Sequence, residues 1–126
     1  MTAVLDASSL LAFLHNEPGA QRVWDALPGA LVSTVNWSEV VQKALQRDAD
    51  IAGLHDEFAQ IGVEFVPFTV AQAEIAALLW PRTRASGLSL GDRACLALAM
   101  ERQAPLLTAD RAWSGLDIGV AVEQIR

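Results

Sequence analysis

Four acidic residues stand at the ends of apolar runs or at the starts of helical patterns, and they carry the main chemical signal of the sequence. They are Asp6, Glu39, Asp92 and Asp110. Carboxylate oxygens are the ligands that hard divalent cations such as Mg²⁺ and Mn²⁺ prefer. One or two such cations can polarise a phosphodiester and activate a water molecule for in-line attack. If the four acids meet, they suit metal-dependent phosphodiester hydrolysis.

Each acid also has a purely structural explanation. Asn36-x-x-Glu39 and Ser89-x-x-Asp92 both fit the capping-box pattern, in which a carboxylate at N3 accepts from the backbone N–H of the N-cap. The other two acids fit plain N-caps, and the helix macrodipole favours an acid at any helix N-terminus. Taken singly, each of the four fits a cap better than a catalytic group.

The elements that must position these acids alternate between strand-like and helix-like patterns. Short apolar or β-branched runs predict strands over residues 3–5, 30–35, 63–68, 105–108 and 118–122. Apolar residues at helical spacing predict helices over residues 8–14, 18–27, 37–45, 51–61, 70–84 and 90–100, with a break in the fifth at Pro81. Strands alternating with helices predict an α/β fold, with a mainly parallel sheet covered by helices on both faces.

This fold brings the four acids toward one edge of the sheet. In an open parallel sheet, ligands bind beyond the carboxyl ends of the strands, near the point where the strand order reverses. Asp6 and Asp110 follow strands directly, whereas Glu39 and Asp92 begin helices, and a helix that follows a strand begins at that same edge. Four acids at close range repel unless cations neutralise them or some stay protonated. We therefore expect up to four carboxylates to converge on a divalent-cation site.

Length and composition narrow the class of protein. The 126 residues suit one domain spanning residues 1–126, and with 52% apolar types they can bury a real core. No apolar run approaches the ~18 residues of a membrane-spanning helix, and the N-terminus lacks the basic flank of a signal peptide. The single cysteine, Cys95, excludes a disulfide framework and a zinc–thiolate site. We therefore expect a soluble, cytoplasmic protein.

The formal net charge of −6 argues against charge-driven binding of nucleic acid over the whole surface. It does not exclude an enzyme that acts on nucleic acid, because bound divalent cations change the local sign of an acidic site. The bases are eight arginines and one lysine, which favours bidentate recognition of phosphate. Arg82 and Arg84 are the better candidates for contact with a nucleic-acid backbone. Arg93 and Arg111 fit a phosphate or a neighbouring carboxylate equally well.

Other polar residues carry weaker signals. His15 and His55 have no metal-ligand spacing, which disfavours a histidine-based acid–base mechanism. The glycines form neither a dinucleotide-binding fingerprint nor a P-loop. Ser8, Ser9 and Thr108 lie beside the acids, where they could position water or a metal ligand, and capping and turn roles fit them at least as well.

Four segments of the chain resemble PIN-domain proteins, and more narrowly the VapC toxins of bacterial type II toxin–antitoxin modules. They lie in order along almost the whole chain: VLDAS at 4–8, VNWSEV at 35–40, LSLGDRACLALA at 88–99 and LTADRAW at 107–113. Any one segment alone would be a weak match, whereas four in register are a strong one.

The resemblance implies a PIN-like three-layer sandwich with a central, mainly parallel sheet of four to five strands. It also implies a Mg²⁺- or Mn²⁺-dependent endoribonuclease that cleaves structured RNA such as tRNA or rRNA. Asp6, Glu39, Asp92 and Asp110 match the acidic quartet of the family. Asp6 and Asp92 match the residues most often assigned to direct metal contact. Two other readings are a catalytically inactive PIN-like module that binds RNA or protein, and a metal-dependent phosphatase of another α/β fold.

The resemblance further implies inhibition by a cognate VapB-like antitoxin. We expect a groove for an amphipathic antitoxin helix on the first two helices and the 51–61 helix, lined by Leu10, Leu11, Leu14, Trp24, Leu54 and Phe58. A second apolar patch, around Trp80 and the helix to Met100, is expected to support a homodimer with two-fold symmetry.

Overall fold

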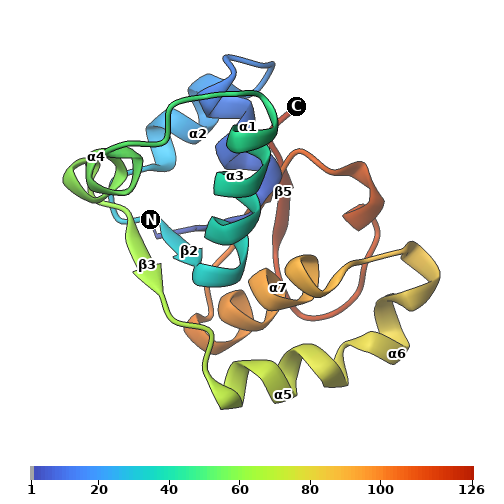
Figure 1. Ribbon diagram of the computed structural model, residues 1–126. Helices are drawn as coiled ribbons and strands as arrows, with labels where there is room; N and C mark the ends of the chain where they lie inside the picture. The colour runs from blue at the N-terminus through green and yellow to red at the C-terminus, as the bar shows by residue number, and fades with distance from the viewer. Residues whose placement is uncertain (1) are drawn as a thin grey trace.

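Five parallel strands form the centre of the computed structural model, which describes residues 2–126 (Figure 1). The strands are short: β1 (Val4–Leu5), β2 (Leu31–Ser33), β3 (Glu64–Val66), β4 (Leu106–Thr108) and β5 (Val122–Gln124). Their order across the sheet is β3-β2-β1-β4-β5. From β1 the chain therefore adds strands first on one side and later on the other. This places the reversal of strand order between β1 and β4, where ligands bind in such sheets.

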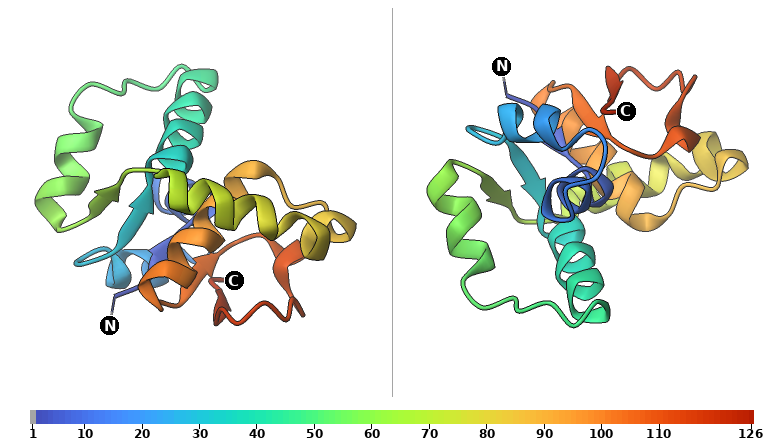
Figure 2. Two further views of the ribbon diagram at one scale, coloured as in Figure 1. Left: turned by 90° about the horizontal axis from the view of Figure 1, so that it is seen from below. Right: turned by 90° about the horizontal axis from the view of Figure 1, so that it is seen from above.

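Helices cover both faces of the sheet (Figure 1). They are α1 (Ala7–Leu14), α2 (Ala20–Ala26), α3 (Thr34–Gln46), α4 (Leu54–Ile61), α5 (Val70–Leu78), α6 (Trp80–Thr83) and α7 (Leu90–Arg102), with 3₁₀ turns η1 (Arg84–Ser86) and η2 (Arg111–Trp113). In Figure 2, α5 lies in front of the sheet in the view from below, and α1 lies in front of it in the view from above. The structure confirms the expected three-layer α/β fold.

Alternating residues of the central strands divide the core into two clusters. Leu5, Val32 and Leu107 pack against α1, α2 and Phe58 of α4 on one face. Val4, Leu31 and Leu106 pack on the other face against α7 and the residues around it. Successive side chains of a strand point to opposite faces, so strands covered on both sides are apolar throughout. The core therefore fixes the central strands from both faces.

Several predicted boundaries are corrected by the structure. The strand predicted over residues 30–35 ends at Ser33, because the Ser33 hydroxyl accepts from the backbone N–H of Val35 (3.2 Å) and caps α3. The strand predicted over 118–122 instead covers Val122–Gln124, where an edge position tolerates polar side chains. The predicted 51–61 helix begins only at Leu54, after the left-handed Gly53.

The predicted break in the 70–84 helix is confirmed. The first part ends at Leu78, and a new short helix begins at Trp80 with Pro81 in its first turn, where a missing N–H costs nothing. Within residues 2–126, no helix is long and apolar enough to cross a membrane.

Candidate active site

All four predicted acids line one cavity of about 140 Å³. Asp6 directly follows β1, and Asp110 comes soon after β4, on the two sides of the strand-order reversal. Glu39 lies near the start of α3, which leaves the end of β2. Asp92 lies in the first turn of α7, which runs back to the start of β4. The sheet order therefore brings together carboxylates that are up to 104 residues apart in sequence.

Asp6 is buried, at 3% exposure, and is held by hydroxyl and amide donors. Its Oδ1 accepts from the backbone N–H of Ser9 (2.8 Å) and from the Ser8 hydroxyl (2.8 Å). Its Oδ2 accepts from the Thr108 hydroxyl (2.5 Å). The residue is thus the N-cap of α1, as its position predicted, and Ser8 and Thr108 fix its orientation. Burial raises the pKa of Asp6 to about 6, although these hydrogen bonds oppose the rise.

This raised pKa predicts how stability depends on pH without divalent cations. Between about pH 4 and pH 6 the folded chain keeps a proton on Asp6 that the unfolded chain has lost. The free energy of unfolding should therefore fall as the pH rises through this window, by about 3 kcal/mol from this group. Urea unfolding in EDTA at pH 4 and pH 7 measures the fall, and Asp6→Asn should lack this part of it. Equal pH dependence in both proteins would contradict the prediction.

Glu39 is held by a fully buried amide. Asn36 is 1% exposed, and its Nδ2 donates to Glu39 Oε1 (3.0 Å) and to the carbonyl oxygen of Gly91 (2.9 Å). The predicted capping box is wrong here, because α3 already begins at Thr34 and Asn36 lies inside the helix. Burial, together with the charge of Asp92, raises the pKa of Glu39, while Asn36 and Lys43 oppose the rise.

Gly91 leaves the space that the Glu39 carboxylate occupies. A Cβ atom built at this position would lie 2.1 Å from Glu39 Oε1 and 2.7 Å from its Cδ. Gly91 has an ordinary helical backbone conformation. Glycine is needed here because it has no side chain, and not because of its backbone freedom. The link between Asn36, Glu39 and Gly91 joins α3 to α7 across 55 residues of sequence. This link was not predicted from the sequence. The one hint of it was that a glycine, Gly91, directly precedes the candidate acid Asp92.

Asp92 and Asp110 combine capping with a place in the cavity. Asp92 Oδ2 accepts from the backbone N–H of Ser89 (2.9 Å), and the Ser89 hydroxyl accepts from the N–H of Asp92 (3.1 Å), which confirms the predicted capping box. Burial raises the pKa of Asp92, and the charge of Asp110 adds to the rise. Asp110 is exposed, and its Oδ1 accepts from the N–H of Ala112 (2.9 Å) as the N-cap of η2. Capping therefore accompanies convergence and does not replace it.

The donor chemistry of the cavity fits a hard divalent cation. The acids supply oxygen ligands only, and three of them have pKa values raised by burial. A cation would relieve both the burial penalty and the mutual repulsion of these groups. Among residues 2–126, no three acidic, histidine or cysteine side chains stand close enough to form a ready-made ligand group. The four carboxylates line the same cavity without forming such a group.

The structure also gives the surroundings of three other residues considered in the sequence. Cys95 is fully buried, and burial raises the pKa of its thiol well above the ordinary value, as expected for a core residue. Arg93 donates to the carbonyl oxygen of Ala76 (2.9 Å), and the structure gives it no hydrogen bond to a neighbouring carboxylate within residues 2–126. Arg82 donates to the backbone of Asp117.

Comparison with known proteins agrees with this architecture. Residues 3–118 match the PIN domain. The VapC ribonuclease Mb0625 of Mycobacterium bovis and ribonuclease VapC28 of Mycobacterium tuberculosis are each 32% identical to this chain, over 92% of it and 91% of their own length. A toxin–antitoxin complex from Klebsiella pneumoniae contains a chain of the same fold, with a TM-score of 0.75, 21% identity and 98% of both chains covered. The chain belongs to the PIN-domain family, and its relatives within that family are VapC ribonucleases.

Proposed function

We propose that this protein is a metal-dependent endoribonuclease and the toxin of a VapBC-type module. The observation that carries the proposal is the convergence of Asp6, Glu39, Asp92 and Asp110 on one cavity in a chain related to VapC ribonucleases. Four carboxylates around one small cavity are costly unless positive charge is bound among them. A module that only binds RNA or protein has no use for such a cavity, which favours catalysis over that alternative.

Each carboxylate has a role that follows from its surroundings. Asp6 and Asp92 would hold the first cation, because they match the residues most often assigned to metal contact in the family and are less exposed than Asp110. Glu39 and Asp110 would hold a second cation or the attacking water. Asn36 binds only Oε1 of Glu39, so Oε2 is available for that role. When bound, Mg²⁺ or Mn²⁺ polarises the scissile phosphate and lowers the pKa of a water molecule.

The orientation of Asp6 rests on a small network of hydroxyl groups. Ser8 Oγ donates to Asp6 and accepts from the backbone N–H of Ala109 (2.9 Å). Thr108 Oγ1 donates to Asp6 and accepts from the N–H of Asp110 (3.0 Å). The network therefore ties the turn after β4 to the N-cap of α1. Partners of this kind fix the direction in which a carboxylate presents its oxygens to a metal ion.

Cleavage of structured RNA by the purified protein tests the proposal. With tRNA or rRNA as substrate, we expect cleavage in Mg²⁺ or Mn²⁺, loss of cleavage in EDTA, and recovery when the cation is returned. Which of the two RNAs is cut, and at which position, identifies the substrate class. Binding of RNA without cleavage under every cation condition would support the inactive PIN-like module instead.

We infer that the partner of this chain is a VapB-like antitoxin, as the fold relationship to a toxin–antitoxin complex supports. Two residues expected in its groove, Leu10 and Phe58, are instead core residues at 1% and 2% exposure. Trp24 is 49% exposed and stacks on Phe13, with 5.8 Å between ring centroids. These two aromatic residues line a hollow of about 340 Å³ between α1 and α2, which suits apolar side chains of an antitoxin.

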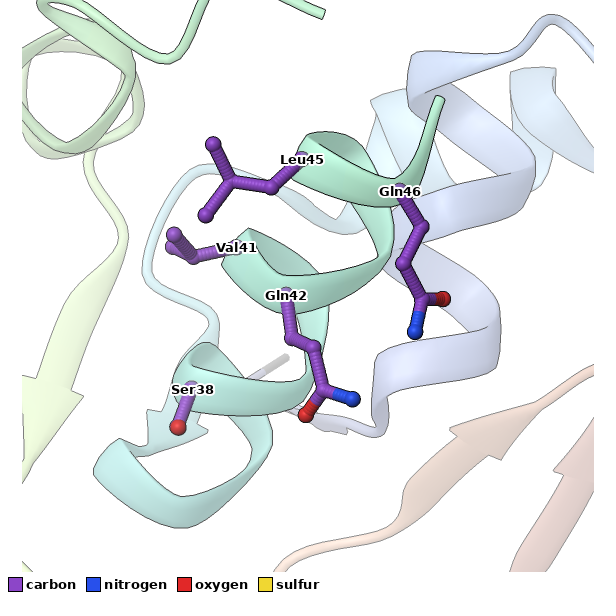
Figure 3. Close-up of a pocket in the computed structure, with 5 residues that line it drawn as sticks. All are labelled: Ser38, Val41, Gln42, Leu45 and Gln46. Carbon is purple, nitrogen blue, oxygen red and sulfur yellow. The ribbon is translucent and has the colours of Figure 1, made fainter. Parts of the chain in front are cut away.

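A larger hollow, of about 600 Å³, lies along the outer face of α3 (Figure 3). Val41 and Leu45 point to the same side of the helix there, and Gln42 and Gln46 line its other flank. None of the residues that line it is charged, so it has no part in the chemistry of the acids. We propose it as a further surface for antitoxin side chains.

We also propose a homodimer through the surface formed by α5, α6 and the ends of α7. Its apolar residues are exposed in the single chain: Val70 at 77%, Leu78 at 75%, Trp80 at 49%, Leu90 at 55% and Met100 at 36%. Exposed large apolar residues are common in protein–protein contact surfaces. The expected patch around Trp80 therefore has apolar surface available for a two-fold contact.

A further inference from the structure

A second cavity, of about 200 Å³, adjoins the cavity of the four acids and has the opposite character. The two cavities share three lining residues: Ser8, Leu11 and Lys43. The second one adds Arg47 from the end of α3, Arg126 from the C-terminal segment, and His15 and Glu17 from the turn after α1. We call it the basic cavity. It holds three of the nine lysine and arginine residues of a chain whose net charge is −6.

Two of these cations are available for a ligand. Arg126 lies 3.5 Å from Glu17 and also donates to the backbone of Pro18, so its charge and that of Glu17 offset each other. Lys43 and Arg47 are exposed, and neither forms an ion pair within residues 2–126. The basic cavity therefore presents two cations without an ion-pair partner among residues 2–126, beside the cavity of the four carboxylates.

The spacing of residues along α3 places these two charges in line with the cavity of the four acids, called the acid cavity below. Glu39, Lys43 and Arg47 are spaced four residues apart, so they lie on one face of the helix with about 6 Å of rise between them. Lys43 is close enough to Glu39 to oppose the rise of its pKa. The row thus runs from a carboxylate in the acid cavity, through a shared lysine, to the arginine of the basic cavity. Arg47 is the C-cap of α3, where a positive charge interacts favourably with the helix dipole. That structural role alone does not explain why Lys43 lies beside it.

We propose that Lys43 and Arg47 form a subsite for the RNA phosphate next to the scissile one. Arginine binds phosphate oxygens in bidentate fashion, and lysine supplies a point charge. An acidic protein needs such a subsite, because its overall charge repels a polyanionic substrate. The proposal rests on the proposed ribonuclease function, since it has Lys43 and Arg47 bind the part of the RNA chain that leaves the reaction centre.

RNA affinity in a cleavage-deficient background tests the subsite. In the Asp92→Asn protein, the Kd for a fluorescently labelled form of the RNA that the unsubstituted protein cleaves is measured by anisotropy across a series of NaCl concentrations. Adding Lys43→Gln and Arg47→Gln should weaken binding by about tenfold or more and make the slope of log Kd against log salt shallower by about one, because one phosphate contact is lost. Arg47→Lys, which keeps the charge, should retain most of the slope.

Arg102→Gln is the matched control. Arg102 is an exposed arginine at the end of α7 with its own partner, Glu64, at 3.2 Å, and it lines neither cavity. If the Lys43/Arg47 double variant binds RNA with the same affinity and slope as this control, the subsite is wrong. If the double variant loses antitoxin binding and keeps RNA binding, the basic cavity is a protein-docking surface and the proposal is overturned. Failure of the unsubstituted protein to cleave any RNA in Mg²⁺ or Mn²⁺ would instead contradict the proposed function itself.

Discussion

Asp92→Asn is expected to lower RNA cleavage by about a thousandfold or more and to leave the protein folded. The substitution keeps the size and hydrogen-bond acceptor of the side chain but removes the charge that a hard cation requires. A bound cation is worth several kcal/mol of charge stabilisation in such reactions, and each 1.36 kcal/mol is a factor of ten in rate. The free energy of unfolding should change by about 1 kcal/mol or less, because asparagine can still accept from the backbone N–H of Ser89.

Ser89→Ala separates the capping role of Asp92 from its role in the cavity. This variant loses the hydroxyl that caps α7 but keeps the backbone N–H that holds the Asp92 carboxylate. It should cost about 1 kcal/mol of stability with little loss of cleavage, the reverse of the pattern for Asp92→Asn. Kinetics on RNA and urea unfolding of both variants make the comparison. If Asp92→Asn destabilises the protein and the folded variant keeps its metal affinity unchanged, Asp92 is only a capping residue.

Gly91→Ala is expected to lower cleavage by about 10- to 100-fold without destabilising the fold. Alanine normally stabilises a helix interior by about 1 kcal/mol relative to glycine. Here its Cβ would lie within 2.1 Å of Glu39 Oε1, so the carboxylate must move away. Glu39 would then lose its hydrogen bond to Asn36 and its place in the acid cavity. Loss of an orienting partner of a metal-binding carboxylate commonly costs this much.

A double-mutant cycle with Glu39→Gln tests this explanation. If Gly91→Ala acts only by displacing the Glu39 carboxylate, it should have little further effect on cleavage once that carboxylate is replaced by an amide. The measurement is kcat/KM on RNA for the two single variants and the double variant, with thermal unfolding of each as the check on folding. Additive losses would mean that the alanine disturbs another part of the site.

The fold class followed from the sequence because it depends on local rules. Short apolar runs alternating with helical patterns indicate a parallel α/β sheet whichever strands become neighbours. The caps at Asp6 and at Ser89–Asp92 were also readable, since a capping side chain contacts backbone within three residues of itself. The start of α3 was placed too late, because Thr34 and Val35 are β-branched residues that fit a strand equally well until Ser33 caps the helix.

The four acids could be proposed from the sequence, but their surroundings were decided by the tertiary structure. Asn36 meets Gly91 across 55 residues, and Thr108 meets Asp6 across 102, through a strand order that no local pattern encodes. The raised pKa of Asp6 arises from burial by elements that assemble around it. In the same way, the sequence shows Lys43 and Arg47 only as two cations on a helix. They lie beside the acids because the tertiary structure brings α3, the turn after α1 and the C-terminal segment together around the basic cavity, next to the cavity of the four acids.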